Sequence, residues 1–369
     1  MRKNVRGLFG FKLLLSVFVL SACILIPSVQ ARADHLVSSE ALKFNQNYSV
    51  LCQTGGDYRE YKITLTQSGK IDFAVSVEAV KDCATTISCL YDSNDEELFR
   101  WREWTWEGET KSATYSKELL AGNYSFIVYN DGNGERPRKF SFTSTFTPSG
   151  ETINESQSAR NNQVTTATAY TQGKTHKGHL ADNDEKDVYR FNVAKDGITT
   201  VNYNPQFAAS TLHLVNMDGD VEYEERGLEF GQQSFRFFTP KGTYYLTVSA
   251  YDRNKAKGTY TLSASSKVFS GVKSKKLKSG KKYGVRYITV KWSTNPDATG
   301  YEVRYSTKKN FKKSSKTLVS GAATNKVTLN NKIKKKKTYY VKVRAYRDYG
   351  NGKRVFSSWS KVQKVTTKN

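Results

Sequence analysis

Histidine is scarce in this chain, and the familiar catalytic motifs are missing from it. Only four of the 369 residues are histidines, and none lies in a Gly-x-Ser-x-Gly, His-Glu-x-x-His or Cys–His context. His176 and His179 are close in sequence, but on a loop or strand their spacing does not bring two imidazoles to one metal ion. The sequence therefore predicts a protein that is not an enzyme, with no catalytic residue, no metal and no other cofactor.

Proline is scarce as well, and aromatic residues are abundant, which together argue against a disordered chain. Six prolines accompany an aromatic content of 13%, and the many Thr, Val and Tyr residues favour strands. Long apolar runs are absent after the N-terminal region, so we expect no transmembrane segment in the mature chain. The predicted class is all-β.

The first 33 residues have the features of a signal peptide. A basic start precedes an apolar stretch over residues 13–26, and small residues surround a cleavage site after Ala33. Cleavage there would leave a secreted chain that begins at Asp34. An alternative stays open, because Leu20-Ser21-Ala22-Cys23 resembles a lipobox whose Cys23 would become a lipidated N-terminus.

The mature chain has three cysteines, Cys52, Cys83 and Cys89. Export permits disulfides, but an odd number leaves at least one thiol unpaired. Cys83 and Cys89 are near enough in sequence to close a small loop. The alternative keeps all three cysteines reduced and buried.

Acidic residues are nearly absent from the C-terminal part of the chain, which we call the back. From Lys267 to Asn369 there are 29 Lys and Arg against three acidic residues, a net charge of +26. Residues 34–266 hold 24 basic and 31 acidic side chains, a net charge of −7. This asymmetry predicts an anionic partner for the back, although lysine can also simply keep a β-domain soluble.

The N-terminal part of the mature chain, residues 34–266, contains two copies of one pattern. In each copy a strand-like alternation of apolar and polar residues reaches a glycine, Gly69 or Gly197, at the same spacing, and a second alternating segment follows further on. Such alternation is typical of half-buried strands between turns, and the matched spacings indicate an internal duplication. The matched segments are 61–65 with 189–193, and 121–128 with 241–248.

The second copy resembles the bacterial pre-peptidase C-terminal domain. The resemblance rests on Asp184-Glu185-Lys186-Asp187-Val188-Tyr189-Arg190-Phe191 and on residues 241–248. That family is a small jelly-roll-like β-sandwich, often attached to secreted enzymes, and some relatives bind collagen or polysaccharide. The resemblance implies a module at 158–265 and a divergent copy at 34–150.

Members of that family often begin with an acidic segment that can bind calcium. The corresponding stretch here, Arg160-Asn161-Asn162-Gln163, has lost its acids, whereas calcium needs several carboxylate oxygens. Asp182, Asp184 and Asp187 could supply part of a site. A solvated turn before a strand explains them more simply, so we expect no metal there.

The back resembles a fibronectin type III domain over residues 268–369. Residues 287–292 alternate into Trp292, and residues 338–345 form the longest alternating strand. Ile333 lies six residues before Tyr339, the spacing of the Leu and Tyr that build the tyrosine corner of that fold. This lysine-rich variety resembles modules of secreted proteins from Gram-positive bacteria. The fold hosts many binding roles, so it does not identify a ligand.

Two groups of residues are candidates for binding. Trp101, Trp104 and Trp106 lie in an insertion of the first copy, where rings on a sheet could contact a glycan or an extracellular protein. Core packing could explain at least two of them. The second group comprises lysines in predicted loops, which would contact anionic wall polymers: Lys275, Lys276, Lys308, Lys309, Lys312, Lys313, Lys334, Lys335, Lys336 and Lys337.

The sequence as a whole predicts three tandem β-sandwich modules, two jelly-roll-like repeats followed by a fibronectin type III sandwich. The expected function is a secreted or cell-wall-associated binding or adhesion protein, held by its cationic third module. No aromatic platform accompanies the lysines, which disfavours nucleic acid as the partner. The alternative function is an accessory or regulatory component of a secreted hydrolase.

Overall fold

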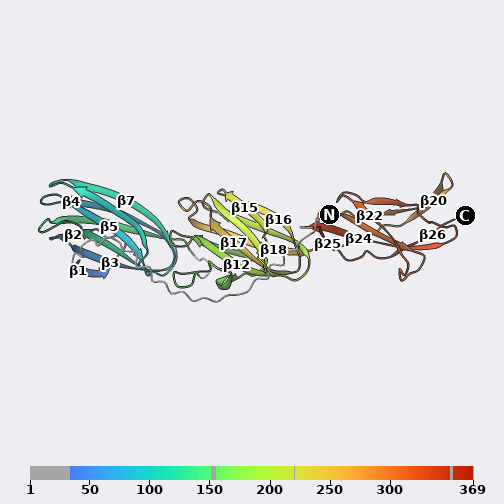
Figure 1. Ribbon diagram of the computed structural model, residues 1–369, viewed down its shortest axis with the longest axis horizontal. Coiled ribbons are helices and arrows are strands. Elements are labelled where there is room, and N and C mark those ends of the chain that lie inside the picture. The colour runs from blue at the N-terminus through green and yellow to red at the C-terminus, as the bar shows by residue number, and fades with distance from the viewer. Residues whose placement is uncertain (1–33, 151–154, 220, 350–351, 369) are drawn as a thin grey trace, which may run out of the picture.

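The computed structural model describes residues 34–150, 155–219, 221–349 and 352–368. The predicted signal peptide, with Cys23 and the cleavage site after Ala33, lies outside these described residues. The described chain forms three β-sandwiches in a row (Figure 1), which confirms the prediction of an all-β protein with three tandem sandwich modules. We call them module 1, module 2 and module 3.

Module 1 packs a five-stranded sheet, in the order β1-β3-β8-β5-β6, against a four-stranded sheet, in the order β2-β9-β4-β7. Its strands alternate between buried and exposed side chains, as β4 shows along its length, because one face of each sheet meets the core. The strands are β1 (His35–Ala41), β2 (Tyr48–Cys52), β3 (Asp57–Leu65), β4 (Gly69–Ala79), β5 (Ala84–Asp92), β6 (Glu97–Thr105), β7 (Thr110–Leu119), β8 (Gly122–Asn130) and β9 (Arg138–Pro148).

Module 2 repeats this topology strand for strand. Its sheets have the orders β10-β12-β17-β14-β15 and β11-β18-β13-β16, so each strand matches the one nine labels earlier. In both modules the first strand pairs in parallel with the third. The predicted duplication is therefore present in the fold. The elements are η1 (Val164–Thr166), β10 (Thr168–Ala169), β11 (Thr175–Leu180), β12 (Lys186–Val193), β13 (Gly197–Pro205), β14 (Ser210–Asn216), β15 (Val221–Leu228), β16 (Gln233–Thr239), β17 (Gly242–Ala250) and β18 (Gly258–Val268).

The glycines and tyrosines that match between the two copies make the same contacts in each. A Cβ on Gly69 would lie 2.4 Å from the Thr147 carbonyl oxygen, and one on Gly197 would lie 2.2 Å from that of Lys267. Only glycine lets the facing strand approach so closely. A tyrosine in the corresponding strand of each copy, Tyr124 or Tyr244, donates its hydroxyl to a backbone carbonyl four residues earlier.

Module 3 pairs a three-stranded sheet, β19-β20-β23, with a five-stranded sheet, β22-β21-β24-β25, in which β26 also pairs with β24. Trp292 is buried, and Tyr339 donates its hydroxyl to the Lys332 carbonyl at 3.1 Å, which forms the predicted tyrosine corner. The strands are β19 (Lys278–Lys282), β20 (Val285–Lys291), β21 (Gly300–Ser306), β22 (Ser315–Ser320), β23 (Lys326–Leu329), β24 (Thr338–Tyr349), β25 (Lys353–Phe356) and β26 (Gln363–Thr366).

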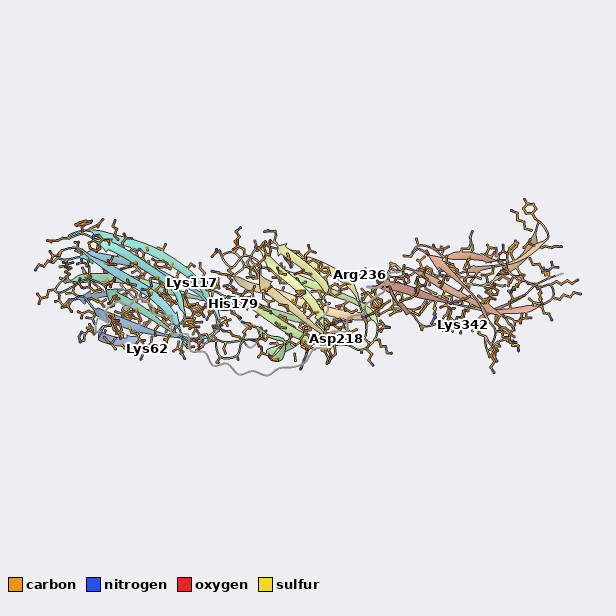
Figure 2. The ribbon with its side chains drawn as sticks, viewed as in Figure 1. Lys62, Lys117, His179, Asp218, Arg236 and Lys342 are labelled. Atoms are coloured by element: carbon orange, nitrogen blue, oxygen red, sulfur yellow. The ribbon has the colours of Figure 1, made fainter. Side chains whose placement is uncertain are left out.

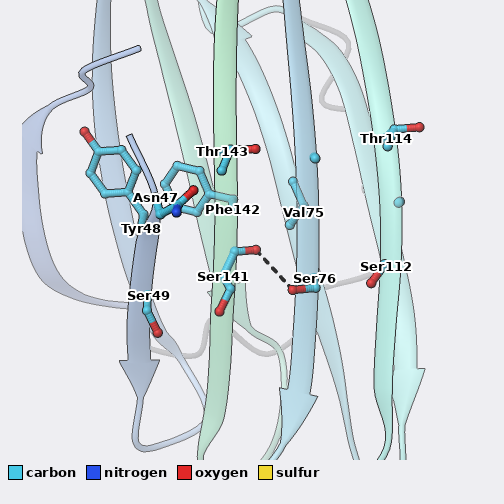
Figure 3. Close-up of a pocket in the computed structure, with 12 residues that line it drawn as sticks. Asn47, Tyr48, Ser49, Val75, Ser76, Ser112, Thr114, Ser141, Phe142 and Thr143 are labelled. Carbon is cyan, nitrogen blue, oxygen red and sulfur yellow. Dashed lines mark hydrogen bonds between the residues drawn. The ribbon is translucent and has the colours of Figure 1, made fainter. Parts of the chain in front are cut away.

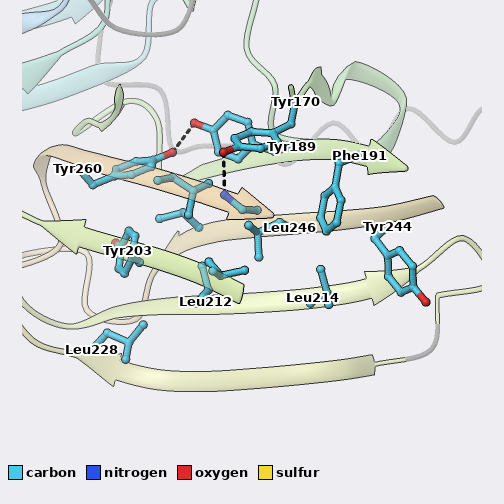
Figure 4. Close-up of a cluster of buried hydrophobic side chains, with 14 of the residues drawn as sticks. Tyr170, Tyr189, Phe191, Tyr203, Leu212, Leu214, Leu228, Tyr244, Leu246 and Tyr260 are labelled. Carbon is cyan, nitrogen blue, oxygen red and sulfur yellow. Dashed lines mark hydrogen bonds between the residues drawn. The ribbon is translucent and has the colours of Figure 1, made fainter. Parts of the chain in front are cut away.

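Each module has its own aromatic-rich core. In module 2, Tyr189, Tyr203 and Tyr260 are fully buried in a core with leucines of the five-stranded sheet, such as Leu212 and Leu246 (Figure 4). The hydroxyl groups of Tyr189 and Tyr260 hydrogen-bond to each other, so these rings bury their apolar area without leaving an unpaired hydroxyl. Among the described residues, no helix is long and apolar enough to cross a membrane.

The junction between modules 1 and 2 is polar. Lys117 forms an ion pair with Asp182 at 3.2 Å, and His179 lies 2.9 Å from a carboxylate oxygen of Glu118. Figure 2 shows Lys117 and His179 where the two sandwiches meet. The Asn183 amide donates to the Tyr124 hydroxyl across the same boundary. These contacts are directional, so they fix the orientation of one module on the other.

The junction between modules 2 and 3 is apolar at its centre. Ile198 and Phe238 of module 2 belong to the hydrophobic core cluster of module 3. The Phe238 ring lies 5.1 Å from that of Tyr349. An ion pair at the rim joins Arg236 to Asp297 at 3.1 Å, and Arg236 appears at this boundary in Figure 2.

Candidate functional site

Eight of the ten predicted lysines gather at the outer end of module 3. Ser306, the last residue of β21, pairs with Tyr340 near the start of β24, so the β21–β22 and β23–β24 loops lie at the same end. All eight side chains are exposed. We call this group the cationic end, and it consists of Lys308, Lys309, Lys312, Lys313, Lys334, Lys335, Lys336 and Lys337.

The other two predicted lysines lie elsewhere. Lys275 donates its backbone N–H to the carbonyl of Lys291, the last residue of β20. This places Lys275 at the opposite end of the module from the β19–β20 turn, which lies beside the β23–β24 loop of the cationic end. Lys276 follows directly, and both side chains are exposed. They therefore contribute to the charge of module 3 without joining the cationic end.

The acidic side chains of module 3 stand apart from the cationic end and are neutralised. Asp297 pairs with Arg236 at the junction, and Asp348 pairs with Arg354. Glu302 is buried between two arginines. None of the lysines of the cationic end forms an ion pair with another described residue. Their charges are therefore available to an anionic partner.

Some cations of module 3 serve the fold instead. The Arg344 guanidinium lies 3.6 Å from the centre of the Phe356 ring and 4.3 Å from that of Trp359. The Lys342 ammonium lies 4.4 Å from the rings of both Phe311 and Trp359. Such cation–π contacts hold these two side chains against the sheet, so not all of the positive charge faces a partner.

The three clustered tryptophans separate into one core residue and two exposed ones. All three lie on or just after β6, where Trp101 points inward and packs against the core of module 1. Trp104 and Trp106 are 47% and 63% exposed, with their rings 6.2 Å apart. Core packing thus accounts for Trp101, and ligand contact by Trp104 and Trp106 stays a prediction.

The outer faces of module 1 carry two hollows that the sequence did not predict. One, of about 660 Å³, lies over strands β2, β9, β4 and β7 (Figure 3). Its lining is mostly small, with Ser49, Ser76 and Ser141 in neighbouring strands, and Ser76 donates to the Ser141 carbonyl at 3.4 Å. Small hydroxyl side chains give this face a shallow and uniform surface.

The second hollow, of about 520 Å³, lies over the five-stranded sheet. We call it the tyrosine groove, and its lining combines tyrosine, isoleucine, arginine and aspartate. A sequence signal for it exists in β8, where Ile127 and Tyr129 are apolar on the outer face although Phe126 and Val128 already fill the inner one. A strand that is apolar on both faces indicates a covered or ligand-binding outer surface.

The prediction of a solvated turn at Asp184 and Asp187 is wrong. Both carboxylates are buried, with exposures of 1% and 0%, and a third buried carboxylate, Glu155, converges on them from the linker before module 2. One ligand oxygen from each lies within 4.8 Å of the others. Asp182 pairs with Lys117 and Lys257 instead.

This carboxylate cluster fits a hard cation. Burial, and then the charge of neighbouring carboxylates, raises the pKa of all three groups. Both side-chain oxygens of Asp184 are buried and have no hydrogen-bond partner among the described residues. Oxygen donors in this arrangement are those that Ca²⁺ prefers, and Glu155, Asp184 and Asp187 would hold it. The sequence expectation of no metal stays a prediction.

The suggested Cys83–Cys89 disulfide is not formed. Cys83 comes one residue before β5 and Cys89 lies within it. An extended strand separates residues six apart by about 20 Å, far beyond the reach of a disulfide. Cys52 and Cys89 are buried, and burial raises the pKa of each thiol to about 11. All three described cysteines are free thiols, and Cys83 is partly exposed, so the alternative of reduced and buried cysteines fits Cys52 and Cys89 but not Cys83.

No protein-family model matches the chain, and no curated protein matches it. Among solved structures it is similar to the pre-peptidase C-terminal domain of a collagenase from Bacillus anthracis, with 28% identity over 27% of this chain and 93% of that one, at a TM-score of 0.24.

Two further similar structures contain fibronectin type III domains. A two-domain segment of chicken tenascin matches at 17% identity, over 50% of this chain and 99% of that one, with a TM-score of 0.26. Domains FN1 to FN3 of chicken CNTN1 match at 13% identity, over 83% of this chain and all of that one, with a TM-score of 0.21. These are the two kinds of domain that the sequence resembles.

Proposed function

We propose that the protein is an exported binding protein of the bacterial cell envelope, held to anionic wall polymers through the cationic end of module 3. The observation that supports this most strongly is the segregation of charge. Eight exposed lysines gather at one end of the row, and the acidic side chains of the same module are neutralised elsewhere.

Phosphate-rich polymers such as teichoic acids suit this arrangement. Each lysine adds a modest attraction, and several acting on one polyanion release counterions together, so adhesion is firm at low salt and weak at high salt. Long lysine side chains on loops also adapt to a polymer without a fixed shape. The loops therefore favour a charge-dense, irregular partner.

Nucleic acid is the less suitable polyanion for this surface. Proteins that hold single strands place exposed rings between their basic residues. The ring within the β21–β22 loop, Phe311, is half-buried, and the Lys342 ammonium covers it at 4.4 Å. The β21–β22 loop thus presents charge without a stacking surface, whereas Tyr283 in the β19–β20 turn is 91% exposed, with the Lys282 ammonium 5.1 Å from its ring.

The test is co-sedimentation of the mature chain with purified Gram-positive cell walls across a salt series. One variant reverses four charges at the cationic end, at Lys309, Lys313, Lys335 and Lys337, each to Glu. We expect it to lose most of its binding, and the salt dependence of what remains should be shallower.

A matched variant controls for net charge. It reverses four exposed lysines of the same module that lie away from the cationic end: Lys275, Lys276, Lys291 and Lys326. This variant should keep most of its wall binding. Walls stripped of teichoic acid should bind neither the unaltered chain nor this variant. Equal losses in the two variants would show that total charge, not the cationic end, determines adhesion. Unchanged binding in both would refute the proposal.

A further inference from the structure

The tyrosine groove of module 1 has a built, two-part lining. Its floor is made by Ile87, Cys89 and Ile127, three outward side chains from the central strands β5 and β8. Ile87 and Cys89 are buried even though they lie on the outer face. The rim that covers them includes Tyr58 and Tyr91. An apolar floor below polar edges is the usual composition of a small-molecule or polymer site.

The strand register places ring, aliphatic and guanidinium groups side by side. Tyr129 of β8 pairs with Tyr58 on one side and with Ile87 on the other, and Ile87 pairs with Arg102 of β6. Because paired residues point to the same face, these four side chains form one row across the sheet. The next row contains Ile127, Cys89 and Arg100 in the same order.

Two guanidinium groups and three carboxylates surround the groove. Arg102 forms an ion pair with Asp131 at 2.9 Å, and Arg100 donates to the Glu97 carboxylate at 2.8 Å. Asp34 accepts a hydrogen bond from the Tyr129 hydroxyl at 2.9 Å. With each guanidinium beside a carboxylate and a further carboxylate at Asp34, the groove has no excess of positive charge to attract a polyanion, in contrast to the cationic end.

The same pairs provide donors and acceptors next to one another. Arg100 also donates to the Tyr91 hydroxyl at 3.0 Å, and that hydroxyl lies 3.2 Å from Glu97. A ligand hydroxyl, which donates and accepts at once, matches such a rim. The apolar C–H face of a pyranose ring matches tyrosine rings and an isoleucine floor. A neutral saccharide combines both features.

We infer that the tyrosine groove binds a neutral saccharide, independently of the proposed retention by module 3. The ligand lies on the Ile87–Ile127 floor, with its hydroxyl groups on the Arg100–Glu97 and Arg102–Asp131 pairs. The hollow on the opposite sheet is lined mostly by small side chains, with Tyr48 and Phe142 at one side, and its lining includes no guanidinium or carboxylate group. It serves as an internal comparison.

Calorimetric titration of the whole mature chain tests this inference. The probes are chitohexaose, cellohexaose, maltohexaose and mannohexaose, with anionic hexagalacturonate as the charged comparison. We expect at least one neutral hexasaccharide to bind, and hexagalacturonate to bind more weakly. Ile127→Trp fills the groove and should weaken binding by about tenfold or more, which corresponds to 1.4 kcal/mol.

Two further variants keep the test decisive. Ser141→Trp fills the opposite hollow of module 1 and should leave saccharide binding within about twofold. Tyr58→Ala removes a rim ring without disturbing the floor and should also weaken binding. Circular dichroism shows whether Ile127→Trp is folded, and Tyr58→Ala keeps the test valid if it is not.

The inference is overturned if no neutral hexasaccharide binds. It is also overturned if hexagalacturonate binds best, or if binding survives both groove variants. Wall retention of Ile127→Trp, measured by co-sedimentation, should equal that of the unaltered chain. Failure of the groove and failure of the cationic end are therefore distinguishable.

Discussion

Glu302 is a buried carboxylate that pairs with two arginines in the basic module 3. Its side chain is 3% exposed and accepts from Arg304 at 2.6 Å and from Arg344 at 2.8 Å. Burial alone would raise the pKa of Glu302, but the hydrogen bonds from both arginines outweigh it and hold the pKa below the ordinary 4.5. The carboxylate therefore stabilises module 3 in its charged form.

Replacing Glu302 with Gln should destabilise module 3 by about 2 kcal/mol at pH 7, because two guanidinium groups lose their shared anion. A group whose folded pKa is lowered contributes stability above its unfolded value of 4.5 and loses it as the pH falls through the lowered folded pKa. The difference between the two proteins should thus vanish in acid. Hydrogen exchange of β24 amides measures it, and a constant difference down to pH 2 would contradict the account.

Single residues also mark the limit of prediction from sequence. The alternation in β6 placed Trp101 on one face and Trp104 on the other, and the structure agrees. The alternation did not show which face of β6 meets the core of module 1. The core-facing side is determined by β5 and β8, which are distant in sequence and pair with each other in the same sheet. The tyrosine groove was missed for the same reason, since its lining comes from four strands.

At the scale of elements, the turn between β11 and β12 combines two roles. Asp182 and Asn183 contact module 1, whereas Asp184 and Asp187 turn inward toward Glu155. Sequence spacing placed the aspartates in a turn before a strand, which is correct for Asp182 and Asp184, whereas Asp187 lies within β12. Their burial follows from the linker residue Glu155 and the facing Tyr260, whose approach no local pattern encodes.

Adding millimolar Ca²⁺ should raise the thermal midpoint of module 2, since a cation that binds only the folded state stabilises it by mass action, by about 2.7 kcal/mol at a hundredfold excess over Kd. Asp184→Asn should remove most of this gain, and a chelator should reverse it. Differential scanning calorimetry with and without Ca²⁺ provides the measurement.

Asp218→Asn is the control, because Asp218 is exposed in the same module (Figure 2). It should respond to Ca²⁺ as the unaltered protein does. If all three proteins gained equally, or none gained, the carboxylate cluster would not be the binding site.

At the scale of the whole molecule, the two junctions differ in kind. The first is a set of ion pairs and hydrogen bonds, whereas the second buries Phe238 in the core cluster of module 3. The duplication and the fold class were readable from sequence because alternation, glycines and tyrosines are local. The junctions were not, since Ile198 and Phe238 look like ordinary core positions of module 2.

Phe238→Ala should cost about 3 kcal/mol and loosen module 3 from module 2, because the cavity opens where the two cores meet. Small-angle scattering should show a broader distribution of molecular lengths, with each module still folded. Phe230→Ala, a change at a phenylalanine that is 66% exposed, should alter neither stability nor length. An unchanged scattering profile for Phe238→Ala would mean that the other contacts of the junction, such as Ile198 and the Arg236–Asp297 ion pair, hold it without this ring.

The direction of the strands has a mechanical consequence. They run obliquely along the row of modules (Figure 1), and β4 pairs with β9 over its entire length, from Gly69 to Ala79. Ladder hydrogen bonds lie across the strands, so tension applied along the row loads many of them in shear simultaneously. Rupture then requires a whole ladder to slip at once, which makes each module resistant to a pull along the row.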